Sequence, residues 1–127
     1  MSHITITLPL PPKVLHPNGR TRKYRYKAAA TKAYRFDCGL AVVDAMNRAR
    51  LTDCPWKCVM REARFFFRTV NPSHFHDPSN LNAWIKAADD ALQDAGLIVD
   101  DRHLTPLPPV AIYGADGPRV ELFVEKD

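Results

Sequence analysis

Alternation of apolar and polar residues begins the chain and predicts its first strand. The two kinds of residue alternate with a period of two over Ile4–Leu8, which is typical of a strand with one buried face. Prolines at positions 9, 11 and 12 end the strand, because proline cannot donate a hydrogen bond to a neighbouring strand. No clear period follows over 13–27, where Pro17-Asn18-Gly19 indicates a turn and 20–27 an exposed basic loop.

Two stretches have the period of a helix. Over 28–51 alanine is frequent and apolar residues step by three and four, namely Ala33, Phe36, Leu40, Val43 and Met46 or Asn47. Gly39 in the middle of this helix is typical of a kink or a close crossing. A second helix is predicted over 79–95, with an apolar stripe of Leu81, Trp84, Ile85, Ala88 and Leu92. Asn82, Lys86, Asp89, Asp90 and Gln93 lie off that stripe.

Three further strands complete the predicted fold. Cys58–Val70 indicates a core strand with charged ends, since it holds Phe65–Phe67 among three arginines. Val110–Tyr113 and Arg119–Val124 are short strands separated by the turn residues 115–118, a pattern that predicts a C-terminal hairpin. The order β-α-β-α-β-β favours one α+β domain over residues 1–127, with a mixed sheet and two main helices.

Composition places the chain among ordinary single-domain proteins. It has 127 residues, of which 46% are apolar and 25% charged, enough for one hydrophobic core. No apolar run is long enough to span a membrane and no signal-peptide pattern is present, so we expect a cytoplasmic protein. Three cysteines without a Cys-x-x-Cys pair argue for reduced thiols. Cys54 and Cys58 with His74, His76 or His103 form an alternative zinc set, without a second pair at finger-like spacing.

Charge is distributed unevenly along the sequence. Six cations without an acid among them occupy one short stretch: Lys13, Arg20, Arg22, Lys23, Arg25 and Lys27. Acids gather later, at Asp77, Asp89, Asp90, Asp94, Asp100 and Asp101. This distribution suits a protein that acts on a polyanion, which the basic segment would bind and the acidic residues would attack. Tyr24 and Tyr26, interleaved with the cations, would allow stacking on bases beside phosphate contacts. The alternative is a solvated loop that the tyrosines pack down.

Two acidic loops flank the second predicted helix. A helix of about fifteen residues is roughly 22 Å long, so Asp77 and Asp101 lie at opposite ends unless Gly96–Val99 runs back along it as an extended segment. Gly96 is well placed for that reversal. Two converging carboxylates and Lys86 could then hold a hard divalent cation and neutralise a phosphate. The alternatives are structural, because Asp77 with Pro78 makes a good helix start and Lys86 with Asp90 an ordinary surface pair.

The combination of these residues resembles the RusA family of Holliday-junction resolvases, in the branch common in phages and prophages. The similarity covers Asp77-Pro78-x-Asn80-Leu81-x-Ala83-x-x-Lys86, then Asp90-Ala91-Leu92, Ala95-Gly96 and Asp100-Asp101. The start of the chain, Leu8-Pro9-x-Pro11-Pro12-Lys13 and Pro17-Asn18-Gly19, is also similar to the start of the family, so nearly the whole chain is covered.

The resemblance implies a homodimeric endonuclease that cuts four-way DNA junctions with Mg²⁺ in recombination and repair. By position, Asp77 and Asp101 would bind the metal, and Lys86 would stabilise charge on the phosphate. Asp100 would assist one of the two metal-binding aspartates or cap the loop. Resolving a four-way junction into two duplexes needs two cuts in strands of like polarity, and this symmetry also favours a twofold dimer. The basic residues between Lys13 and Lys27 would hold the DNA backbone.

Ser79 departs from this resemblance. The family pattern reads Asp-x-Asp-Asn-Leu, whereas this chain has serine at the third metal-ligand position. Serine supplies only a neutral oxygen, so Mg²⁺ should bind weakly and Mn²⁺ should support activity better. Two other functions follow as alternatives. One is a branched-DNA-binding protein that has lost its chemistry, and the other an unrelated zinc or small-ligand protein that uses the His74/His76 loop.

Overall fold

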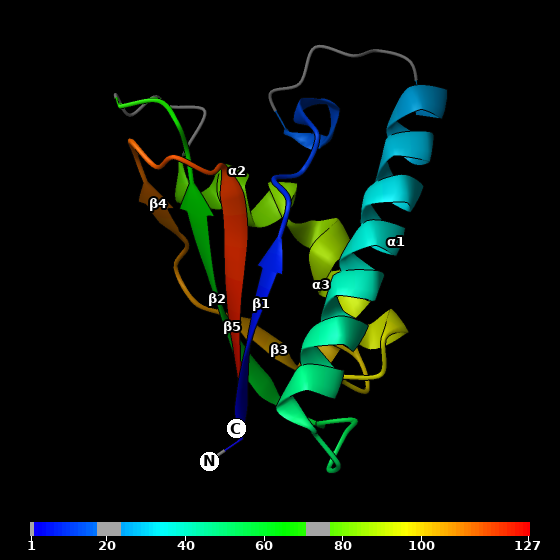
Figure 1. Cartoon of the computed structure of the whole chain (residues 1–127). Coiled ribbons are helices and arrows are strands. Elements are labelled where there is room, and N and C mark those ends of the chain that lie inside the picture. Colours follow the sequence, from blue (N-terminus) through cyan, green and yellow to red (C-terminus); the bar gives the residue numbers. More distant parts are fainter. Residues whose placement is uncertain (1, 18–23, 71–76) are drawn as a thin grey trace.

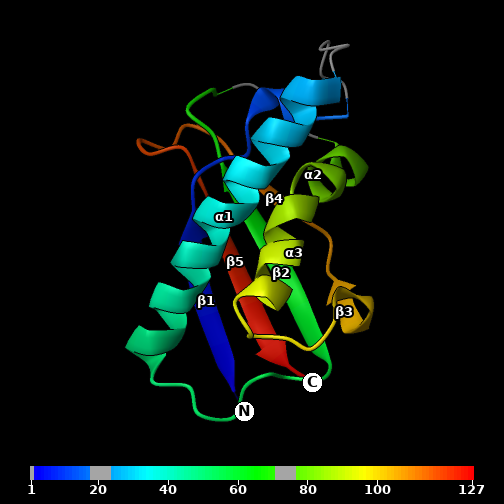
Figure 2. The ribbon, with the colours of Figure 1, turned by 90° about the vertical axis from the view of Figure 1, so that its right-hand side faces the viewer.

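A mixed five-stranded sheet, covered on one face by helices, forms the frame of the protein (Figures 1 and 2). The computed structural model describes residues 2–17, 24–70 and 77–127. The predicted turn at 17–19 lies partly outside these residues, and the predicted loop at 71–76 lies wholly outside them. The elements in chain order are β1 His3–Leu8, η1 Lys13–Leu15, α1 Tyr24–Ala49, β2 Val59–Phe66, α2 Pro78–Trp84, α3 Lys86–Asp94, η3 Asp101–His103, β3 Leu104–Pro106, β4 Val110–Ile112 and β5 Arg119–Lys126. The α+β class and the mixed sheet are therefore confirmed.

Strand β2 lies at the centre of the sheet. It pairs antiparallel with β5, which in turn pairs antiparallel with β1, and on its other side it pairs parallel with β3 and then β4. The predicted C-terminal hairpin is wrong, because β4 and β5 lie on opposite sides of β2. Beyond β4 the chain still follows β2, since the amides of Gly114 and Ala115 donate to the carbonyls of Thr69 and Phe67. Both strands are present where the pattern predicts them, but strand periodicity does not identify the partner of a strand.

The core lies between the sheet and helices α1 and α3, which run side by side over the same face (Figure 2). Alternate residues of the three long strands point into it: Ile4, Ile6 and Leu8, then Val59, Ala63 and Phe65, then Val120, Leu122 and Val124. The stripe predicted for the second helix is buried at all five positions. This agreement follows from the period of 3.6, which places those residues on one side of a helix.

Helix α1 presents a different side to the core from the one its strongest periodicity indicates. Its buried residues are Tyr34, Cys38 and Val42. Phe36, Leu40 and Val43, from the predicted stripe, are 65%, 58% and 42% exposed. Helix α1 is therefore apolar on two opposite sides, and Phe36, Leu40 and Val43 lie on the outer one.

The second predicted helix is two helices. It breaks at Ile85, whose backbone angles φ −89° and ψ 3° end α2 and begin α3 in a new direction. Gly96 then closes the last turn of α3 with φ +82°, a conformation that favours glycine. Residues 97–99 run back as an extended segment, in which the amide of Trp56 donates to Leu97 and the amide of Val99 donates to Trp56. The predicted reversal is confirmed.

Candidate functional site

The reversal after Gly96 brings Asp101 to Lys86. Lys86 Nζ donates to Asp101 Oδ2 at 2.5 Å and to Asp90 Oδ1 at 3.0 Å. The ammonium group is thus shared by a carboxylate one turn along its own helix and one from η3. The side chain of Lys86 is 60% exposed, whereas those of Asp90 and Asp101 are about one quarter exposed. The surface pair of Lys86 with Asp90 is therefore present, and it is part of a larger group.

The position of Asp101 is fixed by contacts on both sides. Its backbone amide donates to Gln93 Oε1 at 3.4 Å, which ties the start of η3 to the last turn of α3. Asp100 caps η3 by accepting from the amide of Arg102 at 2.9 Å and also pairs with the Arg102 guanidinium. These bonds lower the pKa of Asp100 to about 2. Asp100 therefore holds the loop, and Asp101 is the member of the pair that faces Lys86.

Arg35 extends the ionic group onto α1. Its guanidinium donates to both carboxylate oxygens of Asp94 at 2.5 and 2.7 Å, and it lies 3.9 Å from Asp90. The row Asp94, Arg35, Asp90, Lys86 and Asp101 alternates in sign across α1, α3 and η3. Arg35 lowers the pKa of Asp94, while the hydrogen bonds to Asp101 and then Asp90 raise the pKa of Lys86. Lys86 is therefore a fixed positive charge at neutral pH, suited to bind an anion rather than to act as a base.

A buried ion pair anchors α3 beneath this row. Arg61 on β2 donates to both oxygens of Asp89 at 2.9 and 2.7 Å, and to Asn82 Oδ1 on α2 at 3.2 Å. Arg61 is 1% exposed and Asp89 6%, which corrects the expectation that Asp89 lies off the buried side. Burial raises the pKa of Asp89, and the nearby guanidinium opposes that rise. Such bidentate pairs fix geometry well, so this pair sets how α2 and α3 sit on the sheet.

Asp77 and Ser79 lie at the other end of α2 from Lys86. Asp77 occupies the N-cap position and Pro78 the first helical position, as the structural alternative predicted. However, the Asp77 carboxylate makes no capping hydrogen bond, and both Asp77 and Ser79 are exposed. Helix α2 has seven residues and is about 10 Å long. Within the described chain, neither residue bonds to Lys86 or Asp101. The structure thus assembles Lys86 with Asp101 and leaves Asp77 and Ser79 one short helix away.

The predicted DNA-binding residues fall partly within the described chain. Lys13 is exposed on η1, and Arg25 and Lys27 lie on the first turn of α1. Arg20, Arg22 and Lys23 lie outside the described residues. Trp84 Nε1 donates to the carbonyl of Pro12 at 2.8 Å, and the His16 ring packs edge-on against Trp84. This anchor holds η1 against the end of α2, so that η1, α2 and the start of α1 lie at one end of the molecule (Figure 1).

The oxygen donors fit a hard cation, but few of them are close together. Mg²⁺ needs one or two protein carboxylates, with water and substrate oxygens completing its shell. Asp77 and Asp101 offer such carboxylates. Among the described residues, no group of three or more His, Cys, Asp or Glu is placed to hold a metal ion. Cys54, Cys58 and His103 therefore do not form the alternative zinc set by themselves, and His74 and His76 lie outside the described residues. All three cysteines are free thiols.

The sequence identifies Lys86 and Asp101, but not the other residues that the structure brings to them. Arg35, Gln93 and Asp94 join the group only because α1 packs along α3 and the loop returns over it. Their spacing in the sequence contains no signal of this. The repetition of Asp90 and Asp94 at one helical turn is the available hint that α3 has an acidic side.

The chain matches none of the protein-family models and none of the curated proteins with which it was compared. In the part of the chain that the structure describes, no helix is both long and apolar enough to cross a membrane.

Proposed function

We propose that this protein is a metal-dependent endonuclease that cuts branched DNA, with the four-way junction as its substrate. The observation that carries the proposal is the return of the chain to the start of α3, where Asp101 Oδ2 lies 2.5 Å from Lys86 Nζ. That contact joins two parts of the RusA-like pattern that are fifteen residues apart in the sequence.

Each residue has a defined role in this proposal. Asp101 and Asp77 would hold Mg²⁺ or Mn²⁺ through carboxylate oxygens, and Ser79 would add a neutral oxygen. The bound ion would supply activation of water and stabilisation of the leaving oxygen. Lys86, kept protonated by its two carboxylates, would bind the charged phosphate in the transition state. Arg35 and Asp90 position Lys86 and do not touch the substrate.

The cations at one end of the molecule would hold the DNA backbone. Lys13 lies on η1, and Arg25 and Lys27 lie on the first turn of α1, at the same end of the molecule as α2, the helix that starts next to Asp77 (Figure 1). Contacts of this kind fix the register of a protein on DNA without reading its sequence. The protein would act as a homodimer, because resolving a junction takes two symmetric cuts.

Ser79 favours a second candidate function, a protein that binds branched DNA without cutting it. Serine replaces a carboxylate where the metal is expected, and among the described residues no group of three or more His, Cys, Asp or Glu is placed to hold a metal ion. One assay separates the two functions. A synthetic four-way junction and a linear duplex of equal length are incubated with the protein, with and without Mg²⁺ or Mn²⁺. Metal-dependent cutting of the junction alone supports the nuclease, and tight junction binding without cutting supports the second function.

Single substitutions test the two acidic positions. Asp101→Asn or Asp77→Asn should abolish metal-dependent cleavage but leave junction binding intact or tighter, because each removes a negative charge that faces phosphate. Asp116→Asn, at an exposed turn outside the ionic row, is the matched control and should cleave like wild type. Asparagine caps a helix about as well as aspartate, so Asp77→Asn should stay folded. Cleavage at the wild-type rate by either variant would exclude that carboxylate from the site.

A further inference from the structure

Lys86 is bonded to the carboxylate that would bind a divalent cation in the proposed site. Its ammonium nitrogen lies 2.5 Å from Asp101 Oδ2, a contact that uses the charge of that carboxylate and one lone pair of its oxygen. A hard cation such as Mg²⁺ binds directly to carboxylate oxygens. An ion on Asp101 would therefore lie beside the ammonium group, and the two positive charges would repel each other.

Of the two partners, Lys86 is the one that is free to move. The backbone amide of Asp101 donates to Gln93 Oε1, and Asp100 holds the same turn by accepting from the amide of Arg102. Lys86 instead carries its ammonium group on a flexible four-carbon stem, and its side chain is 60% exposed. Repulsion at Asp101 would therefore move the lysine and leave the carboxylate in place.

Asp90 offers Lys86 a second acceptor on the same helix. Its Oδ1 atom accepts from Lys86 Nζ at 3.0 Å, across one turn of α3. Because both residues belong to α3, this contact does not depend on the return of the chain that brings Asp101. Arg35 lies 3.9 Å from Asp90 but donates both of its hydrogen bonds in the row to Asp94. The Asp90 carboxylate can therefore hold the ammonium group alone.

The charges of the ionic row favour binding of one divalent cation. Three carboxylates, those of Asp90, Asp94 and Asp101, face the two cations Arg35 and Lys86, which leaves a net charge of −1. Addition of a divalent ion changes this −1 to +1, and a positive group attracts phosphate where a negative one repels it.

We propose that Lys86 competes with a divalent cation for the Asp101 carboxylate, and that Lys86 withdraws to Asp90 when the ion binds. Lys86 then has one carboxylate partner instead of two, which leaves more of its N–H donors for phosphate. Asp90 is a positioning residue in this exchange, because it keeps the ammonium group at the start of α3. The inference rests on the proposed function, since it takes Asp101 as a metal ligand, and it adds a control of metal affinity by the lysine.

Manganese binding to the full chain, without DNA, tests the competition. The electron paramagnetic resonance signal of free Mn²⁺ gives the dissociation constant, and Asp101→Asn should lose the site. Lys86→Met, which has a similar length without the charge, should bind Mn²⁺ roughly fivefold more tightly, the effect of losing one partly exposed ion pair. Equal affinities of Lys86→Met and wild type would overturn the proposal, as would an Asp101→Asn variant that binds like wild type or the absence of Mn²⁺ binding from all the proteins.

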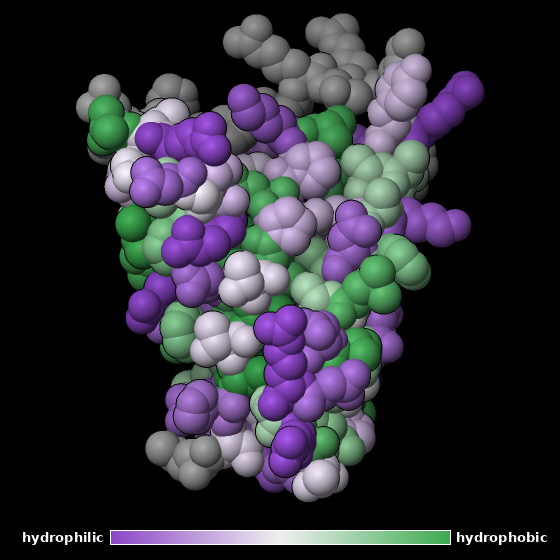
Figure 3. All heavy atoms as spheres, in the orientation of Figure 1, coloured by the Kyte–Doolittle hydropathy of each residue, from purple (hydrophilic) through white to green (hydrophobic). Residues whose placement is uncertain are grey.

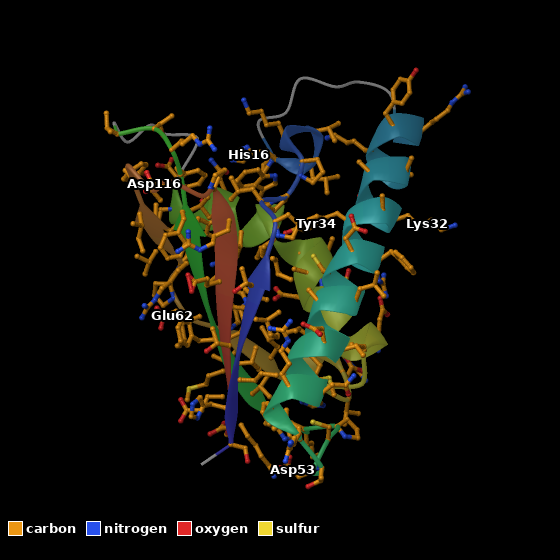
Figure 4. All side chains as sticks on the ribbon, viewed as in Figure 1. His16, Lys32, Tyr34, Asp53, Glu62 and Asp116 are labelled. Carbon is orange, nitrogen blue, oxygen red and sulfur yellow. The ribbon has the colours of Figure 1, made fainter. Side chains whose placement is uncertain are left out.

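Lys32→Met is the matched control for the loss of a positive charge. The outer surface of α1 mixes charged and apolar side chains along the right-hand margin of the space-filling view (Figure 3). Lys32 points from α1 away from the body of the protein, so water and salt screen its charge from Asp101 (Figure 4). Lys32→Met should therefore bind Mn²⁺ like wild type. Tightening by the same factor in Lys32→Met and Lys86→Met would show an effect of net charge and overturn the competition.

Asp90 is tested in both lysine backgrounds. Asp90→Asn should weaken Mn²⁺ binding about threefold, because Lys86 then has Asp101 as its remaining partner, and Asp90→Glu should restore the affinity. With Lys86→Met already present, Asp90→Asn should have little effect, because Asp90 acts through the ammonium group. Weakening by the same factor in both backgrounds would show that Asp90 acts on the ion itself and overturn its positioning role. Circular dichroism should be the same for all variants, since the buried ion pair that anchors α3 is intact in each.

The two proposals fail in different experiments. Junction cleavage by wild type, with no tightening of Mn²⁺ binding in Lys86→Met, would overturn the competition and leave the nuclease standing. Tightened Mn²⁺ binding in Lys86→Met, with no junction cleavage by wild type under any metal, would support the competition and overturn the nuclease.

Discussion

Lys86 is the residue on which the candidate site depends. It lies off the buried side of α3, and only the fold gives it a second carboxylate partner in Asp101. Its raised pKa means that the Lys86 ammonium contributes stability below the usual lysine pKa wherever its carboxylate partners are ionised, and that this contribution disappears as the pH rises through the raised value. Across the neutral range Lys86 therefore stays protonated. A ligand phosphate or cation at this point would compete with existing ion pairs instead of meeting free side chains.

In the proposed metal site, Ser79 is the position where a neutral hydroxyl replaces a charged carboxylate. The Asp77 carboxylate beside it is exposed and is not used as a helix cap, so it is available to a cation. A serine hydroxyl adds no charge to offset the dehydration of Mg²⁺. We predict that Ser79→Asp lowers the Mg²⁺ concentration for half-maximal junction cleavage by roughly tenfold, as expected when an oxygen site gains one ligand charge.

A metal titration of cleavage on one junction measures this effect. Ser79→Asn is the matched control, because it has the size of aspartate without its charge and should resemble wild type. The helix start tolerates both residues. If the folded Ser79→Asp variant needs as much Mg²⁺ as wild type, Ser79 does not face the metal.

Part of this site can be predicted from the sequence for a simple reason. Gly96 marks the end of α3, and a chain that reverses there can pass back along the helix it has just left. That reversal is the condition on which the sequence-based prediction depends, and in the structure it brings Asp101 to Lys86. Arg35 is not predictable, because its place beside Asp94 depends on the packing of α1 against α3, which no short spacing records. The burial of Asp89 is equally hidden, since its partner Arg61 lies on a distant strand.

At the scale of elements, α1 shows how periodicity can be right about a helix and wrong about its orientation. Two stripes on opposite sides of the helix share the same period, and the outer one has the longer run of apolar residues, from Ala33 to Val43. The core instead uses Tyr34, whose hydroxyl donates to the carbonyl of Pro9 at 2.7 Å, together with the small Cys38 and Val42. Similarly, periodicity locates β4 and β5 but not their pairing, since the contacts that separate them are made by β2.

Two glycines of the helices make opposite predictions for stability. Gly39 lies within α1, and a Cβ added there meets nothing within 4 Å. Gly39→Ala should therefore raise the free energy of unfolding by about 0.5–1 kcal/mol. Gly96 also has open space around it, but its φ of +82° is strained for alanine. Gly96→Ala should lower the free energy of unfolding by roughly 1–2 kcal/mol.

Urea unfolding of the three proteins, followed by circular dichroism at one protein concentration, measures both changes. Neither new methyl group meets another atom within 4 Å, so the two variants differ only in backbone conformation. The comparison therefore separates the effect of a positive φ from that of steric conflict. A decrease in the stability of Gly39→Ala would show that this glycine serves a close approach on the outer side of α1.

At the scale of the whole molecule, charge is separated along the length of α1. The first turn carries Arg25 and Lys27 and lies beside Lys13 on η1, while the last turns hold Arg48 paired with Asp44 at 3.0 Å. The acidic members of the ionic row are each engaged by Arg35 or Lys86. The exposed cations Lys13 and Arg25, with Lys27, thus lie at the end formed by η1, α2 and the start of α1. A polyanion approaching the protein would be drawn to that end.

This distribution predicts how DNA binding depends on salt. Each phosphate that a cation neutralises releases condensed counterions, so removing one such cation makes the slope of log affinity against log salt shallower by roughly 0.9. The triple variant Lys13→Ala/Arg25→Ala/Lys27→Ala should flatten the slope by as much as about 2.7 and weaken binding to junction and duplex alike. Arg48→Ala, at the far end of the same helix and already paired with Asp44, should leave the slope unchanged. Fluorescence anisotropy between about 50 and 200 mM salt measures both variants. Equal slopes for the triple variant and wild type would mean that the DNA lies elsewhere on the protein.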